Sequence, residues 1–139
     1  MSRLAQLGVF LGCLGGVSLF LGLFPFSVNA DITPGIGLTQ IAGMLVGLVL
    51  LVLGGYVIVF ALMHRGRPRT LARDIGVRLG MTGLVFAIAA TLADVMGFGS
   101  HNELNGGMLF GWVQGAGMLA GFLISAIGVL VYGAAGQQN

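Results

Sequence analysis

Charged residues are the scarcest class in this chain, and lysine is missing altogether. Only 7% of the 139 residues are charged, as six arginines and four acids, while 57% are hydrophobic. A soluble globular domain has about 25% charged residues, so this chain has too few charges to solvate its surface. The formal net charge is only +2, which does not favour binding of nucleic acid. The composition therefore predicts an integral membrane protein.

Cysteine and catalytic motifs are equally sparse. Cys13 is the single cysteine, so the chain can form neither an internal disulfide nor a cysteine-rich metal site. The sequence has no His-Glu zinc motif, no phosphate-binding glycine loop and no set of residues typical of a nucleophilic enzyme. We therefore expect no enzymatic activity, no metal site and no cofactor.

What the sequence has instead is four long apolar runs, at about residues 4–26, 36–63, 75–98 and 108–135. Each run is long enough for a membrane helix, which needs ~20 apolar residues. No segment alternates between apolar and polar residues, as the strands of a membrane barrel do. Since hydrocarbon offers no partner to an unpaired backbone group, four transmembrane α-helices are expected. The predicted fold is all-α, with a single membrane domain over residues 1–139.

Arginine is concentrated in the connection between the second and third runs, HRGRPRTLARD at 64–74. Its four arginines are Arg65, Arg67, Arg69 and Arg73. Arg3 precedes the first run, and the other two connections contain no arginine. The positive-inside rule therefore predicts that this connection and both termini are cytoplasmic, in a bacterial-type inner (plasma) membrane. The four arginines are candidates for setting the topology and for contacting anionic lipid.

The first apolar run has an alternative interpretation as a signal peptide. Arg3 is followed by an apolar stretch and then by Val28-Asn29-Ala30, which resembles a cleavage site. However, the apolar stretch is longer than the ~7–15 residues typical of a signal peptide. We therefore expect the first run to be a retained membrane helix.

Two segments of the chain are nearly the same, QIAGMLVG at 40–47 and QGAGMLAG at 114–121. At this offset of 74, seven of the fifteen positions from Gln40 to Gly54 are identical to their counterparts. An offset of 75 aligns RLAQLG with RLGMTG at the starts of the first and third runs. The sequence thus predicts two tandem helical hairpins that cross the membrane in the same direction, as a parallel repeat. The two repeats are about 1–63 and 75–139.

Glycine recurs at spacings of three and four in these runs, which places the glycines on helix faces. Membrane helices associate through the close contact that small residues permit, because lipid is as apolar as leucine. The glycines expected to pack are Gly8, Gly12, Gly43, Gly47, Gly80, Gly83, Gly117 and Gly121. A second stripe, of Gly107, Gly111 and Gly115, is surplus to one seam and is expected to face another subunit.

Asp94 lies about one turn from the outer end of the third run, on its small-residue face. An acid within a membrane span is a functional candidate by default, although near the boundary it is more often hydrogen-bonded or solvated. Thr91, Gln40 and Gln114 lie near the same end, so these four residues are expected to form a polar network or a small-ligand site. Asp94 aligns with Leu19 at the offset of 75, so the first repeat lacks the acid.

The histidines and aromatic residues are expected near the membrane boundaries. His64 and His101 fall in connections on opposite sides of the membrane, so they cannot share a metal, and each is expected to be solvated or interfacial. Trp112 and Tyr132 suit the aromatic belts at the two interfaces.

Three functions remain open. The first is a non-catalytic structural or accessory subunit of a larger or self-associated membrane assembly, whose partners are lipids and other subunits or second copies. The second is a small oligomeric transporter or channel that uses Asp94, although no broken helix surrounds a charge at the midplane. The third is a quinone- or cofactor-binding subunit of an electron-transfer complex, and the lack of a histidine within a helix argues against haem. Short connections and the surplus glycine stripe favour the first.

Overall fold

The computed structural model describes residues 2–24, 38–96 and 112–136, apart from the side chains of Leu38, Asp94 and Val95. Four α-helices are found there: α1 (Arg3–Leu23), α2 (Leu38–Val59), α3 (Leu71–Val95) and α4 (Trp112–Ala134). A π-helical turn, η2 (Phe60–His64), extends α2. The prediction of an all-helical chain is confirmed for this part of the protein.

All four helices are long and apolar enough to cross a membrane. Helices α1 and α4 have 21 and 23 residues. At ~1.5 Å per residue, such helices match a hydrocarbon core that is ~30 Å thick. Large apolar side chains are exposed on every helix, for example Phe10, Val46, Val85 and Leu130. Lipid is a favourable solvent for such surfaces, whereas water is not.

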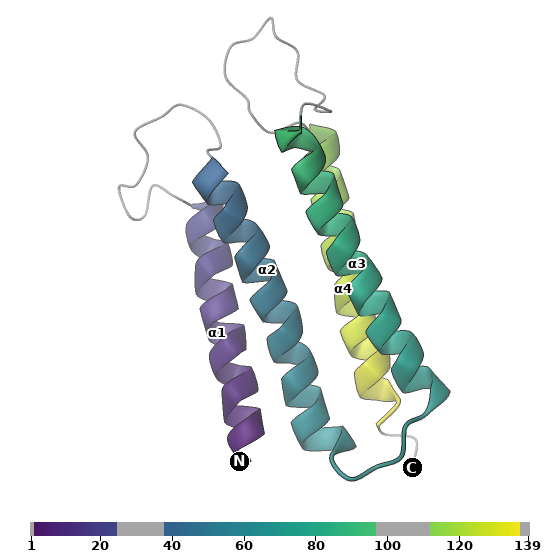
Figure 1. The fold of residues 1–139 in the computed structure, drawn as a ribbon. Helices are drawn as coiled ribbons and strands as arrows, with labels where there is room; N and C mark the ends of the chain where they lie inside the picture. The colour runs from purple at the N-terminus through teal and green to yellow at the C-terminus, as the bar shows by residue number, and fades with distance from the viewer. Residues whose placement is uncertain (1, 25–37, 97–111, 137–139) are drawn as a thin grey trace, which may run out of the picture.

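Helix α1 packs along α2 and α3 packs along α4, so the chain forms two antiparallel hairpins that lie side by side (Figure 1). Helix α2 joins the hairpins, because it contacts both α4 and α3. The start of α1, the end of α4 and the connection 65–70 lie at one end of the molecule (Figure 1). We refer to this end as the arginine end and to the opposite one as the far end.

Helix α3 begins four residues earlier than the sequence predicted, at Leu71 rather than at residue 75. The backbone N–H groups of Arg73 and Asp74 donate to the carbonyl oxygen of Thr70 at 3.1 and 3.2 Å. The Asp74 carboxylate lies in this first turn, where it is favoured by the positive end of the helix dipole. Arg73 and Asp74 therefore belong to a helix and not to the arginine-rich connection.

Glycine backbones form the seam within each hairpin. A Cβ atom at Gly47 would lie 2.5 Å from the backbone nitrogen of Leu19, and one at Gly121 would lie 2.6 Å from that of Ala87. No side chain fits at such distances, so these glycines allow α2 to touch the backbone of α1 and α4 to touch that of α3. The hairpins are therefore held by main-chain contact along their length.

The seams of the two hairpins match at fixed offsets. Gly47 and Gly121 correspond at 74, as the sequence predicted, but their contacts Leu19 and Ala87 correspond at 68 and not at the expected 75. The same pair of offsets relates the contact of Gly15 with Leu51 to the contact of Gly83 with Ser125. An offset of 68 aligns GVFLGCLGGV in α1 with GVRLGMTGLV in α3, where six of ten residues are identical. Asp94 thereby aligns with Phe26 instead of Leu19.

The hairpins meet at a small apolar core. Leu48 and Val52 of α2 and Leu84 and Ala87 of α3 are buried together there. Toward the arginine end, the hydroxyl of Tyr56 on α2 donates to the carbonyl oxygen of Gly76 on α3 at 2.8 Å. Because this contact involves one face of α2 only, the hairpins are joined on the α3 side and less closely apposed beside α1.

Candidate functional site

The predicted polar network lies at the far end, and the structure describes three of its four side chains. Thr91 is 1% exposed, and its hydroxyl donates to the carbonyl oxygen of Ala87 in its own helix at 2.7 Å. Gln114 is buried in the first turn of α4, and Gln40 is half-buried in the first turn of α2. The side chain of Asp94 lies outside the described residues, although its backbone belongs to the last turn of α3. The network stays a prediction.

Most of the predicted packing glycines lie at tight contacts. A Cβ atom would clash with the neighbouring helix at six of the eight positions: Gly8, Gly47, Gly80, Gly83, Gly117 and Gly121. A Cβ at Gly43 would make only ordinary contacts, at 3.9 Å, and one at Gly12 would meet nothing within 4 Å. Gly107 and Gly111 of the surplus stripe lie outside the described residues.

An apolar groove of about 360 Å³ lies between the hairpins in the far half of the molecule. We name it the α1–α4 groove after its two outer walls. Its lining residues are Leu19, Leu23, Met44, Leu48, Gly115, Met118, Leu119 and Phe122. None of these residues has a polar side chain, so the groove is suited to hydrocarbon or to apolar side chains and not to a polar ligand.

The α1–α4 groove continues along one face of α1 toward the arginine end. Gly12, Gly16, Leu19 and Leu23 follow one another at spacings of four, three and four, which places them on one face of the helix. A Cβ atom at Gly12 or Gly16 would meet nothing within 4 Å. This face is distinct from the glycine seam with α2, so α1 has a second small-residue surface that no described residue covers.

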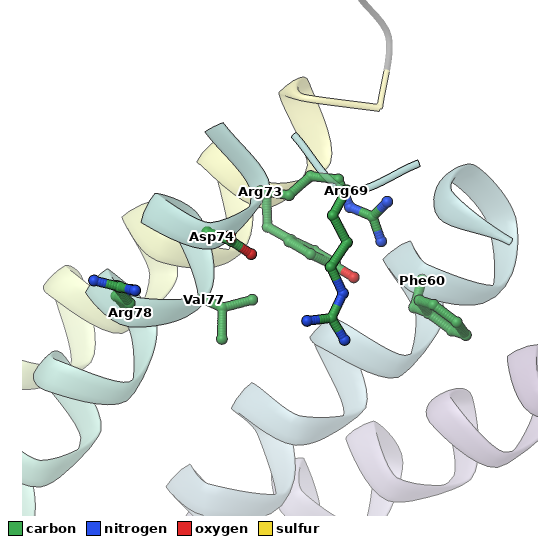
Figure 2. A pocket seen from close by; sticks show the side chains of 7 residues that line it. Phe60, Arg69, Arg73, Asp74, Val77 and Arg78 are labelled. Atoms are coloured by element: carbon green, nitrogen blue, oxygen red, sulfur yellow. The ribbon is translucent and has the colours of Figure 1, made fainter. Parts of the chain in front are cut away.

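A second pocket, of about 480 Å³, lies at the arginine end and is open to its surroundings (Figure 2). We name it the arginine pocket. Its lining residues are Phe60, Arg69, Arg73, Asp74, Val77, Arg78 and Tyr132. In Figure 2, Phe60 lies on one side, and Asp74, Val77 and Arg78 lie on the other, with Arg69 and Arg73 between them. The pocket thus combines three guanidinium groups with apolar walls.

Arg73 is the most firmly held of these arginines. It is 7% exposed, and its Nη1 donates to the carbonyl oxygens of Arg67 and Pro68 at 3.2 and 2.9 Å. Its guanidinium lies over the ring of Tyr132, 5.7 Å from the centroid, as in a cation–π interaction. Its Nε is buried and has no hydrogen-bond partner among the described residues. The early start of α3 turns this side chain inward.

The other arginines of the connection have different environments. Arg67 donates to the carbonyl oxygen of Gly136, which ties the connection to the end of α4. Arg65 and Arg69 are exposed, and only Arg69 lines the arginine pocket. Arg78 was not among the predicted site residues, but its position five residues after Arg73 on a helix that starts at Leu71 brings both to the same pocket. The sequence signal was the helix start, which we placed too late.

The expectation that His64 is solvated or interfacial is wrong. His64 is 1% exposed, because η2 carries it inward against α4. Its Nε2 lies 2.6 Å from the carbonyl oxygen of Tyr132 and donates to it, since a carbonyl only accepts. The backbone N–H of Gly136 donates to Gly133 rather than to Tyr132, so His64 caps a carbonyl that the end of α4 leaves free. His101 lies outside the described residues.

Tyr132 was expected in an interfacial aromatic belt but is buried, at 7% exposure. The rings of His64 and Tyr56 pack against it edge-on, with centroids at 4.4 and 5.2 Å. Trp112, in contrast, is 80% exposed at the start of α4, as a belt residue would be. The arginine end therefore has an ordered polar and aromatic core that hydropathy did not reveal.

Among the described residues, no group of three or more histidine, cysteine, aspartate or glutamate side chains could hold a metal ion. Comparison with protein-family models, curated proteins and solved structures finds no match for this chain. The function is therefore argued from the two pockets and the surface of α1.

Proposed function

We propose that this protein is a non-catalytic accessory subunit of a membrane assembly, and that it binds a transmembrane helix of a partner chain along the α1–α4 groove. The observation that carries the proposal is the continuous face of Gly12, Gly16, Leu19 and Leu23, which begins at two uncovered glycines and ends in an apolar groove. Such a face is long enough to meet about three turns of another helix.

The physical basis is helix packing in lipid. Helices gain nothing by hiding apolar surface from lipid, so they associate where small residues allow close approach and where lipid packs poorly. Gly12 and Gly16 form the small-xxx-small spacing that permits such approach. Met44 and Met118 line the groove on facing helices, and their flexible side chains can adapt to the ridges of an incoming helix.

The proposal includes an orientation and an origin. The arginine end is assigned to the cytoplasm of a bacterial-type inner membrane by the positive-inside rule, which makes both termini cytoplasmic. The two hairpins are assigned to a tandem duplication, because their glycine seams match at offsets of 74 and 68. Gly55 and Val129 also differ by 74, and they face each other across the hairpins, as equivalent residues beside a two-fold axis would.

The alternative of quinone binding is less well supported by this groove. A quinone ring needs hydrogen-bond donors for its carbonyl oxygens, and the lining has no polar side chain. The alternative of transport rests on Asp94 alone, and the hydroxyl of the nearby Thr91 is already bonded within α3.

Affinity purification from native membranes in mild detergent tests the proposal. Gly16→Ile places a branched side chain on the face that would meet the partner helix, while its Cβ meets nothing within this chain. Leu14→Phe adds comparable bulk to the opposite, exposed face of α1 and is the matched control. We expect a membrane protein to co-purify with the wild type and with Leu14→Phe, and its yield to fall about tenfold with Gly16→Ile. Equal yields from both variants, or no stoichiometric partner, would contradict the proposal.

A further inference from the structure

The arginine pocket is a built cationic site and not a scatter of surface charges. Three arginines against the single carboxylate of Asp74 leave two positive charges in excess. Arg73 is fixed by two backbone carbonyls and the ring of Tyr132, so its guanidinium is in place before any ligand arrives. Its buried Nε has no acceptor among the described residues, and an anion in the pocket would supply one.

The helix beside the pocket adds to this positive field. Helix α3 starts at Leu71, so its positive dipole end adjoins Arg69 and Arg73. The hydroxyl of Thr70, next to that helix start, is also buried without a hydrogen-bond partner among the described residues. A doubly coordinating anion such as a phosphate fits this arrangement, because guanidinium groups match its oxygens in pairs.

The remaining walls of the pocket are apolar. Phe60 and Val77 line it from α2's extension and from α3, and Phe60 is exposed toward the surroundings. Arg78 lies seven residues into α3, about 10 Å along the helix from Leu71. An arginine at this depth keeps its head at the membrane surface by extending toward it. A ligand that satisfies the whole pocket therefore has a phosphate at one end and hydrocarbon at the other.

We propose that the arginine pocket binds the headgroup phosphate of an anionic phospholipid, whose acyl chains lie against Phe60 and Val77. The lipid occupies the leaflet at the arginine end. Arg69 and Arg78 contact the phosphate from opposite walls, and the Nε of Arg73 faces it from the interior. This site is separate from the α1–α4 groove, so it does not depend on the proposed partner helix.

The test measures lipid retained by the full chain after detergent exchange. The protein is reconstituted into phosphatidylcholine vesicles that contain one-tenth phosphatidylglycerol, extracted in mild detergent, and its bound lipids are counted by native mass spectrometry. Arg69→Gln and Arg78→Gln are compared with Arg65→Gln, an exposed arginine of the same connection that does not line the pocket. Both pocket residues are exposed, so these variants are expected to fold, which gel filtration verifies.

We expect the wild type to retain phosphatidylglycerol in preference to phosphatidylcholine, and each pocket variant to lose about fivefold of that preference. Arg65→Gln retains the wild-type preference. Equal losses in all three variants would show a general charge attraction and would overturn the proposal. Loss of bound phosphatidylglycerol in 10 mM inorganic phosphate, with no loss in equimolar chloride, would identify soluble phosphate as the ligand and would overturn it as well.

Discussion

At the scale of single residues, this protein separates glycines that cannot be replaced from glycines that can. A Cβ at Gly121 would lie 2.6 Å from backbone atoms of α3, whereas one at Gly16 would meet nothing within 4 Å. Both occur in similar sequence surroundings, so hydropathy and spacing alone do not distinguish them. The difference arises from which helix face meets a neighbour.

The first prediction compares alanine at these two positions. Gly121→Ala forces α3 and α4 apart, because backbone atoms cannot yield as a flexible side chain does, and we expect a loss of about 1–3 kcal/mol of stability. Gly16→Ala should leave stability unchanged or raise it slightly, since alanine is the better helix former. Thermal unfolding in detergent, followed by circular dichroism, checks the pair. Similar melting temperatures for the two variants would show that the seam is not a backbone contact.

The second prediction concerns the buried imidazole of His64. His64→Phe removes the donor to the carbonyl oxygen of Tyr132 and leaves that oxygen unpaired, which costs about 1–3 kcal/mol. His64→Gln retains an N–H donor and should recover part of the loss. The same unfolding measurement applies. If glutamine and phenylalanine destabilise equally, the hydrogen bond does not account for the burial of His64.

At the scale of elements, helix α3 and its connection show where prediction from sequence ends. The arginine-rich segment predicted a solvated loop up to Asp74, but the helix begins at Leu71 and turns Arg73 inward. Similarly, the π-helical turn η2 inserts extra residues per turn, so it shifts His64 to a face that α-helical spacing would not give. Both errors concern helix ends, where hydropathy changes gradually and local geometry decides orientation.

The third prediction tests the role of Arg73 in holding the connection 65–70. Arg73→Gln removes the bonds to the carbonyl oxygens of Arg67 and Pro68 and the contact with Tyr132. Loss of these charge-assisted bonds should increase opening of the connection about tenfold. Trypsin cleavage at Arg65, Arg67 and Arg69 reports that opening. Arg78→Gln, which lines the same pocket without bonding the connection, serves as control, and equal cleavage rates for both variants would contradict this role.

At the scale of the whole molecule, the four helices and the correspondence of α2 with α4 could be predicted, but that of α1 with α3 could not. The offsets of 75 and 68 differ by seven residues, which is nearly two helical turns. A shift of two turns keeps the glycines on the same face, so spacing does not choose between the two alignments. Only the contacts with the partner helix do, and they select 68.

The same limit applies to the candidate sites. The sequence indicated the glycine faces and the importance of the arginines, because composition and spacing record both. It did not indicate the α1–α4 groove or the arginine pocket, because each forms between helices that are distant in sequence. The side chain of Asp94, which the sequence singled out, lies outside the described residues, so its role stays a prediction.

The central claim is that a partner helix lies along the α1–α4 groove, and site-specific photo-crosslinking in intact cells tests it most directly. A photoreactive residue at Leu19 would lie in the groove, whereas one at Leu21 would lie on the opposite, exposed face of α1 at nearly the same depth. The account predicts one discrete crosslinked protein from Leu19 and only lipid adducts from Leu21. A crosslink of equal strength from both positions, or lipid adducts alone from Leu19, would contradict it.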